Sequence, residues 1–173
     1  MGSILRPVDR SDLDNVHAWH NDRNLCRNTF GFILPSSKEA VSRWYDQNIA
    51  GGDSRNAIFG IVNADSPAAI CGLVMLRDIS WVHRSASFGI FLGEDGNRGK
   101  GIGSRAVSAI LDYGFNDLGL HRVALEVSAE NLGAIRLYER FGFKREGILR
   151  EAKFIDGTYI NVLVMGLLAA ERA

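Results

Sequence analysis

The stretch Gly96-Asn97-Arg98-Gly99-Lys100-Gly101-Ile102-Gly103-Ser104 lies between a strand pattern and a helix pattern. Its glycines permit positive φ angles and a close approach of the backbone, so several amide groups can point into one hollow. The N-terminus of the following helix adds partial positive charge, and Arg98, Lys100 and Arg105 add full charges. This segment predicts a site for a phosphate or pyrophosphate group; the alternative is a flexible surface turn.

Two well-known phosphate loops fit this segment poorly. A Walker A loop needs Ser or Thr after its Gly-Lys pair, but Gly101 follows Lys100, and Glu94 stands at the position of the first glycine. A dinucleotide fingerprint would follow the first strand of a parallel unit and would need an acidic residue at the end of the next strand. Here Glu126 lies in the middle of the next strand, so a nucleotide-binding oxidoreductase is a weak alternative.

Three runs rich in Ile, Val and Phe precede the glycine-rich turn. They are joined by short loops and predict an antiparallel meander; they cover residues 57–63, 69–76 and 85–92. Further upstream we expect a short strand at residues 4–8. Two short helices are expected after it, one opening at Ser11 and one at Ser36 or Ser37.

Downstream of the turn the apolar residues follow helical spacing from Ile102 to Phe115, up to a stop at Gly119. A strand at 123–127, a helix from Ala134 to Phe141 and a strand at 159–168, apolar on both faces, complete the pattern. The predicted fold class is α+β, with a mixed, mostly antiparallel central sheet flanked by helices. Antiparallel pairing is expected first along the chain, and parallel pairing across a helix later.

Composition limits the function classes. The chain has 173 residues and equal numbers of acidic and basic residues, and its pI is about 6.9. One domain is expected, with no nucleic-acid or membrane partner, because no broad positive field is present. Cys26 and Cys71 lie far apart and are expected to be buried bystander thiols. A cytoplasmic protein is expected, because no apolar run is long enough to cross a bilayer and the N-terminus has no signal pattern. The histidines show no ligand spacing, so no metal is expected.

The segment Arg98 to Gly103 resembles the Arg/Gln-x-x-Gly-x-Gly/Ala signature of the GNAT superfamily of N-acetyltransferases. Residues 125–131 and 137–143 resemble the second signature of ribosomal-protein alanine acetyltransferases, and residues 82–88 resemble spermidine acetyltransferases. The resemblance implies a single N-acetyltransferase domain over 1–173, with acceptor-side helices in 1–50 and an acetyl-CoA-binding core in 82–145. Acetyl-CoA is the implied co-substrate.

The resemblance also implies roles for individual residues. Tyr138 matches the acid beside the coenzyme sulfur, although helical periodicity alone suggests a core aromatic; Glu126 matches the base, and its alternative is an ion pair or a solvated face. Asn131 is expected to cap a helix and to contact the coenzyme. The remaining implied coenzyme-binding residues are Ile90, Phe91, Leu92, Arg98, Gly99, Lys100, Gly101, Ile102, Gly103 and Ser104.

The amine acceptor is the least determined part of the prediction. The segment from His20 to Pro35 carries Asp22 with Arg23 and Arg27, so it lacks the acidic excess that favours a polycation. We therefore expect a protein or peptide N-terminus, with a polyamine, amino-sugar or aminoglycoside as alternatives. A non-catalytic acyl-CoA sensor is the alternative of another class. Similar proteins are often homodimers. Asn161 stands where this branch often has Asp, which puts an acid role there in doubt.

Overall fold

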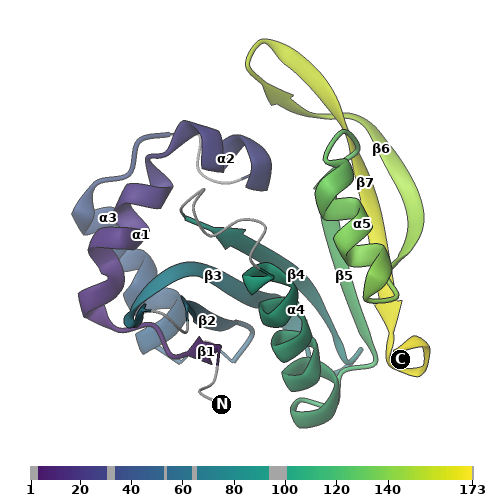
Figure 1. The fold of residues 1–173 in the computed structure, drawn as a ribbon, viewed down its shortest axis with the longest axis horizontal. Coiled ribbons are helices and arrows are strands. Elements are labelled where there is room, and N and C mark those ends of the chain that lie inside the picture. The colour runs from purple at the N-terminus through teal and green to yellow at the C-terminus, as the bar shows by residue number, and fades with distance from the viewer. Residues whose placement is uncertain (1–3, 31–33, 53, 64–65, 94–100, 173) are drawn as a thin grey trace.

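Seven strands form one sheet in the order β1-β2-β3-β4-β5-β7-β6 (Figure 1). The computed structural model describes residues 4–30, 34–52, 54–63, 66–93 and 101–172. Neighbouring strands are antiparallel except β4 and β5, which are parallel, so the expected mixed, mostly antiparallel sheet is confirmed. The strands are β1 (Leu5–Arg6), β2 (Ala57–Asn63), β3 (Ser66–Ser80), β4 (Ser85–Leu92), β5 (Arg122–Ser128), β6 (Lys144–Ile155) and β7 (Thr158–Leu168).

The helices fall into two groups that cover opposite faces of the sheet. The N-terminal group is η1 (Arg10–Asp12), α1 (Leu13–His20), α2 (Arg23–Thr29), α3 (Lys38–Tyr45) and η2 (Asp46–Ala50). The later group is α4 (Ile102–Asp112), η4 (Tyr113–Asp117) and α5 (Leu132–Arg140), with a final turn η5 (Ala169–Glu171). Successive β3 residues alternate between the two apolar clusters: Leu73 packs with the first group and Val74 with the second.

The larger apolar cluster fixes the position of α4 and α5 against the central strands. Val123, Leu125 and Val127 point toward these helices and are buried, whereas Glu126 between them is exposed. The same alternation continues on β7, where Leu163, Met165 and Leu167 are buried in this cluster. Because β7 lies between β5 and β6, it is an interior strand, as its apolar character on both faces predicts.

The elements that were not expected from the sequence include the helix α2 and the strand β6. The segment after His20 contains α2, which begins at an N-cap, Asp22, whose carboxylate accepts hydrogen bonds from the backbone of Asn24 and Leu25. The strand β6 lies at the sheet edge, and most of its residues are exposed, so it has no alternation of apolar and polar residues. The expected strand at 4–8 is shorter, and that at 69–76 is longer, than predicted.

None of the helices that the structure describes combines the length and apolar character that a membrane crossing requires.

Candidate active site

The sheet opens between β4 and β5. These parallel strands pair only at three positions, the last being Ser87 with Ala124. Beyond that point β4 stays paired with β3 as far as Leu92, and β5 stays paired with β7 as far as Ser128. The backbone edge of β4 from Phe88 to Leu92, which includes Ile90 and Phe91, is therefore unpaired on the β5 side. The register of β4 with β3 is continuous through Gly89, so a bulge is not what opens the sheet.

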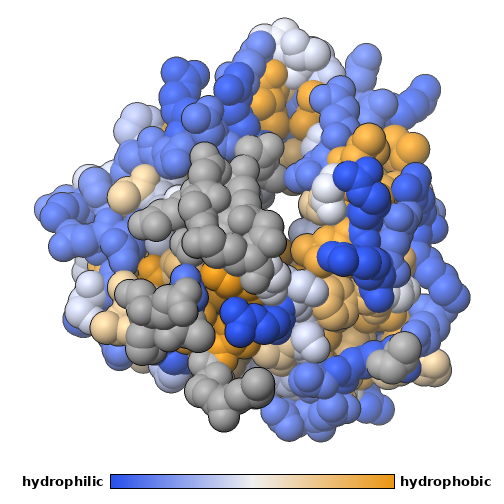
Figure 2. All heavy atoms as spheres, viewed as in Figure 1, coloured by the Kyte–Doolittle hydropathy of each residue, from blue (hydrophilic) through white to orange (hydrophobic). Residues whose placement is uncertain are grey.

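A cavity of about 1340 Å³ occupies this opening and extends to the N-terminal helices. Figure 2 shows the face of the molecule hollowed near its middle, with apolar residues beside the hollow. Of the predicted site residues in the described part of the chain, all line this cavity: Ile90, Phe91, Leu92, Gly101, Ile102, Gly103, Ser104, Glu126, Asn131 and Tyr138. The predictions for Arg98, Gly99 and Lys100 fall outside the described residues.

The N-terminus of α4 presents unpaired backbone donors to the cavity. Gly101 is the N-cap residue, with φ of 73°, a left-handed conformation that glycine adopts without strain. Gly101 has no side chain to cap the helix, and no described side chain accepts a hydrogen bond from the amides of Ile102, Gly103 and Ser104, which remain available. A Cβ placed on Gly103 would meet only the end of the Leu92 side chain, at 3.8 Å. This geometry is suited to an anionic ligand.

Tyr138 lies on α5 and reaches the point where the strands diverge. Its side chain is buried, and its ring packs edge-on against Phe88 of β4, with 5.8 Å between ring centroids. The Phe143 ring lies at 5.9 Å in a tilted arrangement. Burial raises the pKa of the Tyr138 phenol to about 12. No other group in the described part of the chain hydrogen-bonds its hydroxyl. Tyr138 is thus both a core aromatic, as periodicity suggests, and a cavity residue with a free donor.

Glu126 projects from the middle of β5 on the face opposite the α4–α5 core. Its neighbours on this face of the strand are Ala124 and Ser128, and its partner on the adjacent strand β7 is Val164. Within the described ranges no cation forms an ion pair with Glu126. An exposed, unpaired carboxylate therefore stands at the wall of the cavity, and the ion-pair alternative finds no support in these residues.

Asn131 caps α5 and also lines the cavity. Its Oδ1 accepts a hydrogen bond from the backbone N–H of Ala134 at 3.1 Å, as expected of an N-cap residue. No described group accepts a hydrogen bond from its Nδ2, so the side-chain amide can donate to a ligand.

Several cavity residues from the N-terminal helices were not identified from sequence. His20 is buried, its ring lies edge-on to Trp44 at 5.6 Å, and burial, aided by repulsion from His17, lowers its pKa to about 4. The one available signal was its spacing, because His20 lies one turn after the buried Val16. The other such residues are Trp19, Leu25, Cys26, Thr29, Phe30, Trp44 and Asn48.

The two cysteines differ in their environment. Cys71 is buried, as expected, whereas Cys26 is half-buried and contributes to the cavity wall. Burial raises the pKa of the Cys26 thiol, which keeps it protonated. In the described part of the chain no cluster of three or more His, Cys, Asp or Glu side chains is arranged to hold a metal ion.

The side chain of Asn161 has a structural role. Its Oδ1 accepts a hydrogen bond from the backbone N–H of Glu151 at 2.9 Å. Glu151 has φ of 51° and lies where the pairing of β6 with β7 shifts register. The Asn161 side chain therefore pairs a backbone donor within this irregular part of the ladder.

Comparison with known proteins supports this architecture. Residues 3–144 match the model of the acetyltransferase (GNAT) domain. A spermidine N(1)-acetyltransferase of Vibrio cholerae is 35% identical over 96% of this chain and 93% of its own length. That of Escherichia coli K12 is 37% identical over 93% of this chain and 83% of its own length.

The crystal structure of the Vibrio cholerae spermidine N-acetyltransferase in complex with CoA and spermine superposes with a TM-score of 0.88. It is 34% identical to this chain, and the match covers 96% of this chain and 95% of that one. The split sheet, the uncapped helix N-terminus and these matches lead to one conclusion: the chain belongs to the GNAT family and is an N-acetyltransferase.

Proposed function

We propose that this protein transfers the acetyl group of acetyl-CoA to a primary amine of a polyamine of the spermidine class. One observation carries the reaction. The single cavity between β4 and β5 brings together the uncapped N-terminus of α4, the free hydroxyl of Tyr138 and the unpaired carboxylate of Glu126. The acceptor class is supported by the relatives, two of which are spermidine N-acetyltransferases that match nearly the whole chain.

On the coenzyme side, the amides of Ile102, Gly103 and Ser104 would bind the pyrophosphate. The unpaired edge of β4 at residues 90–92 would bind the pantetheine arm as an added strand does, through backbone hydrogen bonds. The free Nδ2 of Asn131 would add one donor. Arg98 and Lys100 remain predicted phosphate ligands.

The reaction needs no covalent enzyme intermediate. The neutral amine nitrogen attacks the carbonyl carbon of the thioester, the C–N bond forms, and the C–S bond breaks as the thiolate leaves. The amine loses one proton, and the thiolate finally gains one. Backbone N–H groups at the open edge of β4 are suited to stabilising the developing oxyanion.

Glu126 is assigned to the proton on the amine. A primary amine with a pKa near 10.4 is neutral only about 0.04% of the time at pH 7, equivalent to about 4.6 kcal/mol. An acceptor with such an amine needs a base in the site that accepts the ammonium proton and so supplies the neutral amine. The exposed carboxylate of Glu126 would accept the proton through water, since it faces an open cavity.

Tyr138 is assigned to the leaving thiolate. With the pKa of Tyr138 at about 12, full proton transfer to a thiolate whose conjugate acid has a pKa of about 8.5 would be uphill by about 5 kcal/mol. The hydroxyl therefore acts chiefly as a hydrogen-bond donor that stabilises the thiolate, and the final proton comes from water. Burial keeps the phenol neutral and its donor available at every physiological pH.

A peptide N-terminus is the second candidate acceptor, and one observation favours it. Among described residues, the cavity wall includes carboxylates from Asp78 and Glu126 only, against three cations, Arg77, Arg140 and Lys153. Asp22 is engaged as the cap of α2. The local charge thus favours an acceptor with one amine, whereas the relatives favour a polyamine, and we give the relatives more weight because they match nearly the whole chain.

The test is a thiol-release assay with acetyl-CoA against spermidine, spermine, peptides, amino-sugars and aminoglycosides. We expect turnover on the polyamines, reduced at least tenfold at pH 7 by Glu126→Gln. Turnover on peptides alone would overturn the acceptor class. Coenzyme binding without turnover on any amine would favour a sensor, and a failure to bind coenzyme would refute the assignment of the α4 N-terminus.

A further inference from the structure

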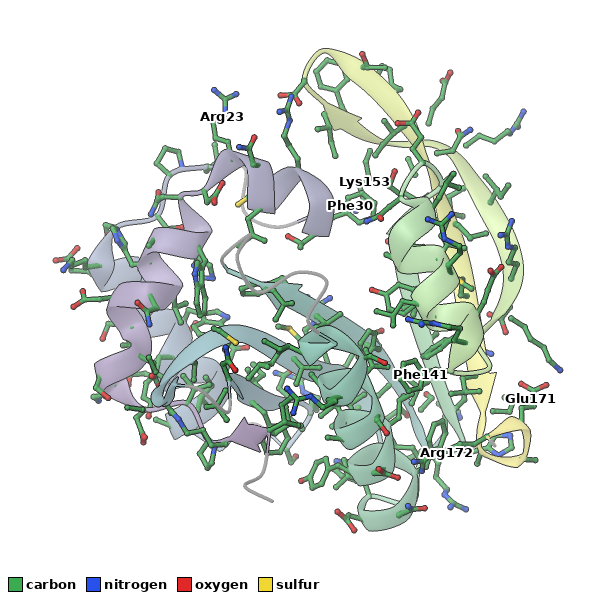
Figure 3. All side chains as sticks on the ribbon, viewed as in Figure 1. Arg23, Phe30, Phe141, Lys153, Glu171 and Arg172 are labelled. Atoms are coloured by element: carbon green, nitrogen blue, oxygen red, sulfur yellow. The ribbon has the colours of Figure 1, made fainter. Side chains whose placement is uncertain are left out.

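Two contacts join α2 to the β6–β7 hairpin across the mouth of the cavity. Arg27 of α2 forms an ion pair with Asp156 at the hairpin turn. Beside it, the Lys153 ammonium lies over the ring of Phe30, with Nζ 5.4 Å from the ring centroid. Figure 3 shows Phe30 and Lys153 approaching each other in the space between α2 and α5, and Figure 1 shows the hairpin rising above that space.

Phe30 and Lys153 both line the cavity that contains Tyr138 and Glu126. Phe30 is the C-cap residue of α2, with φ of 54°, a left-handed conformation that is uncommon for an aromatic residue. The Phe30 side chain is half-buried, and it lies outside both apolar clusters of the fold. Its ring therefore serves the cavity wall rather than the core.

Among the residues that the structure describes, the Lys153 ammonium has an aromatic partner but no anionic one. No described carboxylate lies within ion-pair distance of Lys153, and the nearby Asp156 is paired with Arg27. A ring face that holds an ammonium without the help of a carboxylate is a cation site in its own right. The structure thus records an ammonium, supplied by the chain itself, at this site.

We propose that the Phe30 ring is the subsite for the distal ammonium of the acceptor, and that Lys153 occupies this subsite until the acceptor displaces it. The proposal rests on the proposed function and extends it to substrate selection. An acceptor with one amine leaves Lys153 in place. An acceptor with a second ammonium competes with Lys153, whose flexible stem can swing into solvent because it is only half-buried.

The test compares acceptors that differ in the distal charge: 1,4-diaminobutane and spermidine carry it, and 1-aminobutane does not. Phe30→Leu keeps an apolar side chain but removes the ring face, so we expect KM for the two polyamines to rise about threefold to tenfold. KM for 1-aminobutane should change less than twofold. Lys153→Gln removes the internal competitor, so we expect KM for the polyamines to fall about threefold, whereas KM for 1-aminobutane should change less than twofold.

Matched controls exist on the same hairpin. Phe154→Leu changes an exposed phenylalanine, and Lys144→Gln removes a charge from a lysine paired with Glu171; neither residue lines the cavity. Neither control should alter the ratio of the KM for 1,4-diaminobutane to the KM for 1-aminobutane. Equal changes for diamine and monoamine in Phe30→Leu, or a higher polyamine KM in Lys153→Gln, would overturn the subsite.

A separate readout keeps this test independent of turnover. Calorimetric titration of the coenzyme A-loaded protein gives the dissociation constants of 1,4-diaminobutane and 1-aminobutane. Their ratio reports the preference for the distal ammonium without any turnover. If no amine is acetylated, the proposed function fails; if the diamine then binds no more weakly to Phe30→Leu than to the parent, the subsite fails as well.

Discussion

Removal of the Tyr138 hydroxyl separates its chemical role from its packing role. Tyr138→Phe keeps the ring and therefore its contacts with Phe88 and Phe143. Because no described group hydrogen-bonds the hydroxyl, its loss leaves no partner unsatisfied, and the free energy of unfolding should change by less than about 1 kcal/mol. By contrast, Tyr138→Ala would empty a buried aromatic site and cost about 3–5 kcal/mol.

The expected catalytic loss follows from the hydrogen bond to the thiolate. A hydrogen bond to a charged group is worth about 1.5–3 kcal/mol, which corresponds to a fall in kcat of roughly 10- to 150-fold. The assay is steady-state thiol release at saturating acetyl-CoA, with Tyr113→Phe as the control. Tyr113 packs edge-on against Phe59 and does not line the cavity. An unchanged kcat in Tyr138→Phe would refute the reasoning.

The raised pKa of Tyr138 also predicts a stability effect at alkaline pH. The unfolded chain releases the phenolic proton near pH 10 and the folded chain near pH 12, so the stability present below pH 10 is lost as the pH rises through this window. At pH 11 the loss is about 1 kcal/mol. Between pH 8 and pH 11, urea unfolding should show a free energy of unfolding that falls by this amount more in the parent than in Tyr138→Phe. An identical pH dependence in both proteins would contradict the prediction.

Three further predictions concern other positions. Gly101→Ala should lower stability by about 1–2 kcal/mol, measured by urea unfolding, and weaken coenzyme A binding. The reason is that φ of 73° strains any residue with a Cβ, although a Cβ at this position would meet no described atom within 4 Å. The lowered pKa of His20 means that stability is lost as the pH falls from about 6.5 through 4, and His20→Gln should remove up to about 3 kcal/mol of that loss; parallel urea titrations across this window check it. Asn161→Asp retains the acceptor for the Glu151 N–H, so its free energy of unfolding, measured by urea unfolding, should stay within about 0.5 kcal/mol of the parent's. Asn161→Ala removes this acceptor and should lower the free energy of unfolding by about 1 kcal/mol.

Much of the framework could be predicted because burial imposes periodicity on the chain. The bounds of β2 and β4 agree with the apolar runs at 57–63 and 85–92, and α4 and α5 follow the spacing of their buried residues. The strand β6 could not be found this way, because it lies at the sheet edge with most side chains in solvent. Nor could α2, which buries only Leu25 among its residues of described exposure.

The sequence by itself determined the glycine-rich helix start at Gly101, the alternation that puts Glu126 opposite the buried face of β5, and the capping role of Asn131. These features depend on neighbours along the chain, and local geometry suffices for them. Only the tertiary structure decided that β4 and β5 separate after Ser87, that Tyr138 reaches that opening, and that Phe30 meets Lys153 across the cavity. These features depend on residues far apart in sequence, which only the packing of separate helices and strands brings together.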